Sequence, residues 1–306
     1  MTNTEKNWSD YWRSEGISGE VFVNKDGEKH PVLTTYWQDQ FADLPAQAKI
    51  LDLACGAGSI YAHLAEEHGY VLHAADISAE ALDLLQKRMP GTETTLCPAQ
   101  NTPFEDAMFN MVVSQFGLEY AGLEAFSEAA RLVSPNGKLV ALCHYQDGYI
   151  DANNRAQLAG ANIVQEIDFI KKASVLTQTT FRKRRKDEYQ EAREAFIPAE
   201  RTLAEAVKKY PNGVHTYLYI GFRQMYERRR AYDLRDITGW LKEMKEDVEK
   251  NILRLSEMCN AALNESQLQE IAELLQTKGF QDIDYSVFKM PDKDLPVAWQ
   301  LTATRS

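Results

Sequence analysis

Hydrophobic and polar positions alternate in blocks between residues 49 and 150, where short apolar runs are followed by amphipathic stretches. The runs that predict strands are residues 50–53, 71–75, 94–96, 109–114 and 138–143. Stretches that predict helices lie between them at residues 60–67, 79–88 and 123–133, and Ser78 suits the N-cap of the second. Strands that alternate with helices predict a mostly parallel sheet with helices on both faces.

The alternation stops after residue 150. Residues 151–260 read as mostly helix, with apolar positions three and four residues apart near residues 240–259. Alternation then resumes with a predicted helix at residues 265–278 and strands at 280–288 and 298–303. The connection between these last strands is too short for a parallel crossover, so we expect them to pair antiparallel.

This pattern divides the chain into parts. Residues 1–48 are rich in aromatic and polar groups and predict an N-terminal cover. Residues 49–150 and 261–306 predict one α/β core, with residues 151–260 as a large helical insertion. The expected fold class is therefore a doubly wound, seven-stranded, mostly parallel sheet with an antiparallel last strand and a helical insertion.

Composition narrows the class of protein. The chain has 306 residues, of which 44% are hydrophobic and 26% charged, as in a soluble globular protein. No apolar run approaches the roughly 18–20 residues of a membrane span, and residues 1–8 show no signal pattern, so we expect a cytoplasmic protein. The four cysteines stand far apart and show no metal-ligand spacing, which predicts neither a disulfide scaffold nor a metal site.

The net charge of −11 is unevenly distributed. Residues 151–260 hold 21 Lys or Arg and 17 Asp or Glu, a net of +4, whereas the rest holds 13 and 28, a net of −15. Since the insertion differs in charge from its host, it is the part in which we expect acceptor specificity. Its sign favours an acceptor with some negative charge.

The sequence I-L-D-L-A-C-G-A-G at residues 50–58 carries the strongest chemical signal. A strand runs into a turn with Gly56 and Gly58, at the edge where open α/β sheets bind ligands. A dinucleotide fingerprint would have a third glycine at the position of Tyr61. Asp76 ends the second predicted strand, where a carboxylate can accept hydrogen bonds from both ribose hydroxyls. Together these features suit a nucleoside that carries an amino-acid tail, such as S-adenosylmethionine.

These residues resemble the class I S-adenosylmethionine-dependent methyltransferases over about residues 45–145 and, more loosely, 261–306. The resemblance implies a Rossmann-like fold, S-adenosylmethionine as methyl donor and no metal. It places residues 52–58 at the methionine end, Asp76 at the ribose and Ile77 against the adenine. The implied cofactor-binding residues are Asp52, Ala54, Cys55, Gly56, Gly58, Asp76, Ile77, Ala99, Gln100, Gln115 and Phe116.

Three further segments carry the resemblance. Residues 98–104, P-A-Q-N-T-P-F, match the stretch that flanks the adenine, although Pro98 stands where an Asp is common. The resemblance therefore assigns the adenine contact to the Ala99 backbone and Gln100. Residues 114–119 match the segment beneath the ligand, and residues 131–139 resemble the family's R-x-L-x-P-G-G-x-L turn.

Methyl transfer is an in-line attack, so positioning supplies much of the acceleration. An oxygen or protonated nitrogen acceptor must also lose a proton, and we expect His144, just past the fifth predicted strand, and then Glu119 to take it. The structural alternatives are a strand-end cap for His144 and an ion pair for Glu119. We expect the acceptor to be lined by Tyr11, Trp12, Tyr120 and Tyr145. For Tyr11 and Trp12, the alternative is that they anchor an N-terminal helix in the core.

The leading hypothesis is transfer of a methyl group to a small-molecule acceptor enclosed by the insertion. A macromolecular acceptor, tRNA or protein, is the first alternative, because basic runs occur at residues 182–186 and 228–230. Neighbouring acids that form solvated pairs and the net negative charge make nucleic acid an unlikely partner. The second alternative is a cofactor-binding protein without catalysis. No pattern in the sequence indicates an oligomeric state.

Overall fold

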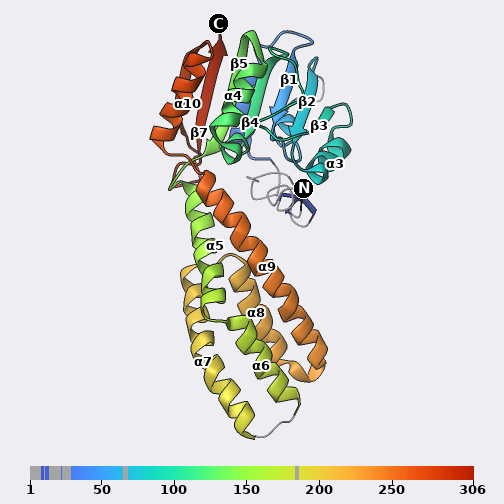
Figure 1. The fold of residues 1–306 in the computed structure, drawn as a ribbon, viewed down its shortest axis with the longest axis vertical. Coiled ribbons are helices and arrows are strands. Elements are labelled where there is room, and N and C mark those ends of the chain that lie inside the picture. The colour runs from blue at the N-terminus through green and yellow to red at the C-terminus, as the bar shows by residue number, and fades with distance from the viewer. Residues whose placement is uncertain (1–7, 10, 14–21, 23–28, 65–67, 183–185) are drawn as a thin grey trace. The chain divides into compact units, whose positions relative to one another are not determined.

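The fold is described from a computed structural model, which describes residues 8–9, 11–13, 22, 29–64, 68–182 and 186–306. Internal contacts divide the chain into two units (Figure 1). The α/β unit comprises Met1–Asp151 and Ala261–Ser306, and the helical unit comprises Ala152–Asn260. Each unit has a hydrophobic core of its own.

The α/β unit contains a seven-stranded sheet in the order β3-β2-β1-β4-β5-β7-β6. Its first five strands in sequence run parallel, and β7 pairs antiparallel with both β5 and β6. The strands are β1 (Lys49–Leu53), β2 (Val71–Asp76), β3 (Glu93–Leu96), β4 (Phe109–Gln115), β5 (Val133–His144), β6 (Phe280–Phe288) and β7 (Ala298–Arg305). This confirms the predicted fold class. Strand order reverses between β1 and β4, which is where sheets of this kind bind ligands.

Both faces of the sheet are buried. Ile50 and Leu51 are neighbours in β1 and fully buried, yet they belong to different core clusters because successive strand residues point to opposite faces. The cluster on the Leu51 face includes α4 (Gly122–Leu132) and α10 (Glu265–Thr277). The cluster on the Ile50 face includes α2 (Pro31–Phe41) and α3 (Ala79–Arg88). Apolar residues on both faces explain the continuous hydrophobic runs of the strands.

Three local predictions need correction. The predicted helix at residues 60–67 is a short 3-10 helix, η1 (Tyr61–His63), and residues 65–67 lie outside the described part. Strand β5 begins at Val133, so most of the turn expected at residues 131–139 lies inside it as an irregularity. The pairing with β4 jumps there from Phe109↔Val133 to Met111↔Lys138. His144 is the last residue of β5 rather than the first one after it.

The helical unit is built from α5 (Tyr149–Glu166), α6 (Phe169–Phe181), α7 (Lys186–Lys209), α8 (Val214–Glu227) and α9 (Leu234–Ala261). Phe169, Phe196 and Phe222 meet at its centre with ring centroids 5.4–5.8 Å apart. Buried positions of α9 such as Leu241, Met244 and Val248 complete this core. None of the described helices is both long and apolar enough to span a membrane.

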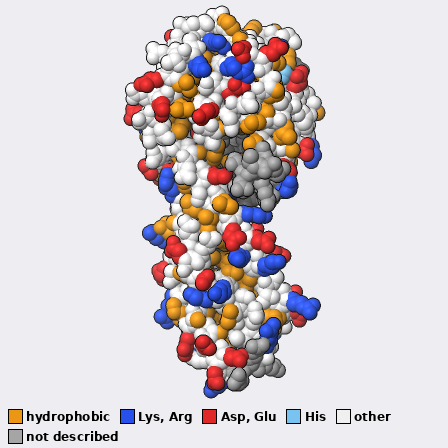
Figure 2. Space-filling model, in the orientation of Figure 1, with side chains coloured by type: hydrophobic (Ala, Val, Ile, Leu, Met, Phe, Trp, Pro, Cys, Tyr) orange, Lys and Arg blue, Asp and Glu red, His pale blue; other side chains and the backbone are white. Residues whose placement is uncertain are grey.

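On the face shown in Figure 2, acidic and basic side chains are interspersed over the helical unit. The basic run at residues 228–230 is exposed, and the Arg229 guanidinium lies 5.1 Å from the centre of the Tyr226 ring. Of the run at residues 182–186, residues 183–185 lie outside the described part. The visible surface therefore has mixed charge rather than one basic stripe.

Candidate active site

The glycine-rich turn after β1 is joined to the end of β2 by Asp76. One carboxylate oxygen, Oδ2, accepts the backbone N–H of Gly56 at 2.8 Å, and Oδ1 accepts that of Ser78 at 2.8 Å. The Ser78 hydroxyl in turn accepts the N–H of Ala81 and caps α3, as the sequence predicts. Asp76 thus orders the turn and the start of a helix at the ligand edge of the sheet.

The turn has a left-handed backbone at Ala54 (φ 60°), Gly56 (φ 52°) and Gly58 (φ 77°). A Cβ at Gly56 would lie 2.5 Å from the Trp12 ring, so this glycine allows the indole to rest on the turn. A Cβ at Gly117 would lie 2.7 Å from the Cβ of Ala54. The turn after β1 is therefore closely packed against both the N-terminal segment and the residues after β4.

Asp52 is almost fully buried in β1, and neither of its carboxylate oxygens has a hydrogen-bond partner in the described part of the chain. Burial raises the pKa of Asp52 well above its ordinary value, and the charge of Asp76 raises it further. Burial also raises the pKa of Asp76, although the N–H groups of Ser78 and Gly56 oppose that effect. Two neighbouring buried carboxyls favour a ligand that brings positive charge.

The end of β4 is linked to α2 by Gln115. Its side-chain oxygen accepts the indole N–H of Trp37 at 2.7 Å, and its amide nitrogen donates to the Ser59 hydroxyl at 3.2 Å. Trp37 is fully buried and so anchors α2. Phe116 follows with φ 56°, and its N–H donates to the carbonyl of Leu142 at 2.7 Å.

His144 and Glu119 form a buried pair. Oε1 of Glu119 lies 2.7 Å from Nδ1 of His144 and accepts the backbone N–H of the same residue at 2.8 Å. Glu119 belongs to η2 (Leu118–Ala121), which follows β4, whereas His144 ends the adjacent strand β5. In the tautomer in which Nδ1 donates to Glu119, Nε2 is the ring nitrogen that can accept a proton. This arrangement suits a general base.

Aromatic rings connect His144 with the glycine-rich turn. The Tyr120 ring meets His144 edge-on at 5.6 Å, and Trp8 meets Tyr120 at 5.0 Å. Tyr11 lies 5.8 Å from Trp8 and 5.0 Å from Trp12, which rests on Gly56. The structure therefore brings the predicted residues Tyr11, Trp12, Tyr120 and His144 together, and the Phe116 ring lies 4.6 Å from His144 on the same edge.

Tyr145, which the sequence analysis expects to line the acceptor, does not join this group. Its ring stacks on Trp299 with centroids 4.5 Å apart, within the core on the α4 face. The reason is that adjacent extended residues point to opposite faces, so His144 and Tyr145 diverge. Two other predicted residues, Ala99 and Gln100, lie in the loop after β3, the first buried in the core and the second exposed. Ile77 lies between Asp76 and Ser78 and is partly exposed.

Residues 50–137 match the family model of a methyltransferase domain. This part of the α/β unit is therefore a methyltransferase domain. An uncharacterised methyltransferase of Schizosaccharomyces pombe is 28% identical over 121 residues, which cover 39% of this chain and 48% of that protein. A ubiquinone/menaquinone biosynthesis C-methyltransferase of Paraburkholderia phymatum is 35% identical over 103 residues, 31% of this chain and 42% of its own. The matches thus span less than half the length of these curated relatives.

Among solved structures, geranyl diphosphate C-methyltransferase from Streptomyces coelicolor is similar with a TM-score of 0.40 and 16% sequence identity. The similarity covers 47% of this chain and 66% of that one. Among the described residues of the chain, no group of three or more His, Cys, Asp and Glu is arranged to hold a metal ion.

The candidate site also includes residues that no sequence pattern marks. The Ser9 hydroxyl lies 3.4 Å from that of Ser78, and Arg13 forms an ion pair with Glu80 at the start of α3. The Ser59 hydroxyl accepts a hydrogen bond from the side chain of Gln115. These contacts join residues far apart in sequence, so a local sequence pattern does not predict them.

Proposed function

We propose that this protein transfers the methyl group of S-adenosylmethionine to a small-molecule acceptor, with His144 as the general base. The observation that carries the proposal is the single ligand edge at which Asp76 holds Gly56 and Ser78 while His144 pairs with Glu119. The family match of residues 50–137 supports the same chemistry.

Several residues would hold the cofactor, and their chemistry fits it. Asp76 presents a carboxylate for the ribose hydroxyls. The left-handed backbone at Gly56 and Gly58 bends the chain sharply at the edge where the amino-acid part would lie. Asp52, buried and without a hydrogen-bond partner among the described residues, compensates the positive charge of the ammonium and sulfonium groups. The cofactor supplies a methyl group activated by its attachment to sulfonium.

The base acts through one ring nitrogen. Nε2 of His144 accepts the proton that an oxygen or nitrogen acceptor loses, and Glu119 stabilises the imidazolium that forms. Glu119 also holds the main chain at His144, so the ring position depends on the same carboxylate. His144 is therefore the proposed catalytic residue and Glu119 its positioning residue.

Two features support a small acceptor. The rings of Trp8, Tyr11, Trp12 and Tyr120 form a continuous aromatic series between His144 and Gly56, and aromatic rings of this kind line small-molecule sites. Residues 151–260 are proposed to act as the substrate cap, because they are inserted directly after the strand that ends at His144. Their net charge of +4 favours an acceptor that carries negative charge.

Calorimetry with S-adenosylmethionine tests the cofactor site. Asp76→Ala should weaken binding tenfold or more, whereas Asp83→Ala, which removes an exposed acid of α3, should leave it unchanged. No binding by the wild-type protein would contradict the proposal.

Incubation with methyl-labelled cofactor and a metabolite extract tests the acceptor class. Label in a small molecule is the expected result. Label in bulk tRNA, or tRNA binding with a steep salt dependence, would favour the macromolecular alternative. Cofactor binding without transfer to any acceptor would favour a non-catalytic role.

A further inference from the structure

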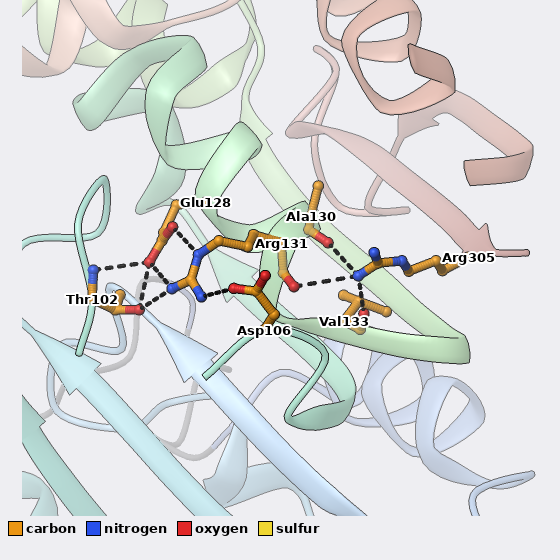
Figure 3. Close-up of polar contacts among 7 residues, drawn as sticks. All are labelled: Thr102, Asp106, Glu128, Ala130, Arg131, Val133 and Arg305. Atoms are coloured by element: carbon orange, nitrogen blue, oxygen red, sulfur yellow. Dashed lines mark hydrogen bonds and ion pairs between the residues drawn. The ribbon is translucent and has the colours of Figure 1, made fainter. Parts of the chain in front are cut away.

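A network of charged and polar side chains ties α4 to the loop that follows β3 (Figure 3). Oε1 of Glu128 accepts the Thr102 hydroxyl at 2.6 Å and the Thr102 backbone N–H at 2.9 Å. Arg131 holds both oxygens of Glu128 through Nη2 at 2.7 Å and Nε at 2.8 Å, and its Nη1 reaches Asp106 at 2.6 Å. Four side chains thus clamp one point of the loop.

The hydrogen bonds of this clamp, formed by Thr102, Glu128, Arg131 and Asp106, stabilise the ionised form of Glu128. Burial by itself raises the pKa of Glu128, but the hydrogen bonds from Arg131 and Thr102 outweigh it and hold that pKa below its ordinary value. Arg131 and Glu128 form a two-point contact between guanidinium and carboxylate, which fixes orientation better than a single ion pair. Thr102 is buried, so its hydroxyl lies in a protected environment.

The clamped loop adjoins the cofactor edge. It begins at Cys97, whose N–H donates to the carbonyl of Asp76 at 3.0 Å. Burial first, and then the charges of Asp76 and Glu128, raise the pKa of the Cys97 thiol to about 11. Residues 98–101 lie between these two anchors and include a turn in which Asn101 N–H reaches the carbonyl of Pro98. The loop is thus held by Asp76 at one end and Glu128 at the other.

We propose that Glu128 and Arg131 are positioning residues for the cofactor, which hold residues 98–102 against the nucleoside bound at Asp76. The proposal rests on the proposed function, since it assumes that S-adenosylmethionine binds at Asp76. Neither side chain contacts the cofactor itself. The clamp lowers the cost of ordering the loop on binding, because the loop is already ordered in the free protein.

The chain offers a matched control in Arg305 of β7. Its Nη1 donates to the carbonyls of Ala130 and Arg131 at 3.2 and 3.3 Å and also to that of Val133 (Figure 3). Arg305 therefore supports the same end of α4 but has no described contact with Thr102. Removal of the Arg305 side chain should loosen the end of α4 and leave the hydrogen bonds between Thr102 and Glu128 in place.

The test measures cofactor affinity and thermal stability for four variants. Glu128→Ala and Thr102→Val, which removes the hydroxyl at nearly constant shape, should raise the Kd for S-adenosylmethionine about tenfold and fivefold. Thr102→Ser, which keeps the hydroxyl, should restore the wild-type Kd. Arg305→Ala should lower the Tm and leave the Kd unchanged.

A second readout separates positioning from general loosening. Amide hydrogen exchange of residues 98–102 should accelerate in cofactor-free Thr102→Val, while exchange in β1 stays as in the wild type. An unchanged Kd in both Glu128→Ala and Thr102→Val would overturn the proposal. A Kd raised as much in Arg305→Ala as in Thr102→Val would also overturn it. Wild-type protein that does not bind S-adenosylmethionine at all would instead contradict the proposed function on which the clamp depends.

Discussion

Nδ1 of His144 lies 2.7 Å from Oε1 of Glu119, and the backbone N–H of His144 reaches the same oxygen at 2.8 Å. One carboxylate therefore sets both the ring and the main chain of the proposed base. The contact exists because β4 and β5 are adjacent and parallel, so the residues after β4 meet the last residue of β5. The two side chains are nearly fully buried, which strengthens the interaction.

His144→Gln should lower the methyl-transfer rate between a hundredfold and ten-thousandfold, because a positioned base contributes about that much. Glu119→Gln should also lower the rate, since an amide that donates to Nδ1 shifts the proton to Nε2 and removes its lone pair. Steady-state kinetics on the acceptor identified with labelled cofactor would measure both. Calorimetry serves as the control, because neither variant should change cofactor affinity. A rate unaffected by His144→Gln would exclude His144 as the base.

Asp52→Asn should stabilise the cofactor-free protein at neutral pH and weaken cofactor binding. The folded-state pKa of Asp52 lies above its unfolded value of about 3.9, so its stability contribution is present below that pH and is lost as the pH rises through the folded pKa. Because an amide at this position does not ionise, Asp52→Asn does not lose this stability at neutral pH. Urea unfolding at pH 7 would measure the gain, and calorimetry the affinity. Lower stability of Asp52→Asn at pH 7 would contradict the expectation.

Ala54 occupies a left-handed backbone conformation that costs an L-residue roughly 1–2 kcal/mol. Ala54→Gly removes that strain but loses about 0.5–1 kcal/mol through the freer unfolded chain. We therefore expect a change in unfolding free energy within about 1 kcal/mol of zero. Ala54→Val should lower the unfolding free energy by several kcal/mol, on the order of the sum of backbone strain and overpacking. The larger side chain has no room, because the Ala54 Cβ already packs against Gly117. Denaturant titration compares the three proteins, and equal stability of Ala54→Val and wild type would contradict the φ angle.

His63 should make the fold less stable in mild acid. Burial first, and the charge of Lys29 second, lower its pKa to about 4. Below the unfolded pKa of about 6.5 the unfolded chain takes up a proton that the folded protein does not, so stability is lost as the pH falls from about 6.5 to about 4. Urea titrations across this range should show a smaller loss for His63→Asn, which retains a polar group facing the Thr34 hydroxyl, at 2.9 Å from Nδ1 of His63. Parallel pH profiles of the two proteins would rule out this contribution.

Much of the α/β unit can be predicted from local pattern. The bounds of α3 and β6 agree with the prediction, because α3 buries Ala81, Leu82 and Leu85 after its Ser78 N-cap, whereas β6 begins directly after Gly279. The predicted helix at residues 60–67 is too long, because the segment after the glycine-rich turn forms a 3-10 helix only from Tyr61 to His63. There the Tyr61 hydroxyl donates to the carbonyl of Ile50, a contact that periodicity does not encode.

The order of strands and helices along the chain, the glycine-rich turn and the acid at the end of β2 can be read from local sequence, because these depend on neighbours within a few residues. The contacts of His144 with Glu119, of Trp12 with Gly56 and of Tyr145 with Trp299 become visible only in the folded chain. Those relationships depend on which strands are adjacent, in what register and with which face toward each core. These contacts arise from packing between residues far apart in sequence, which a local pattern does not predict.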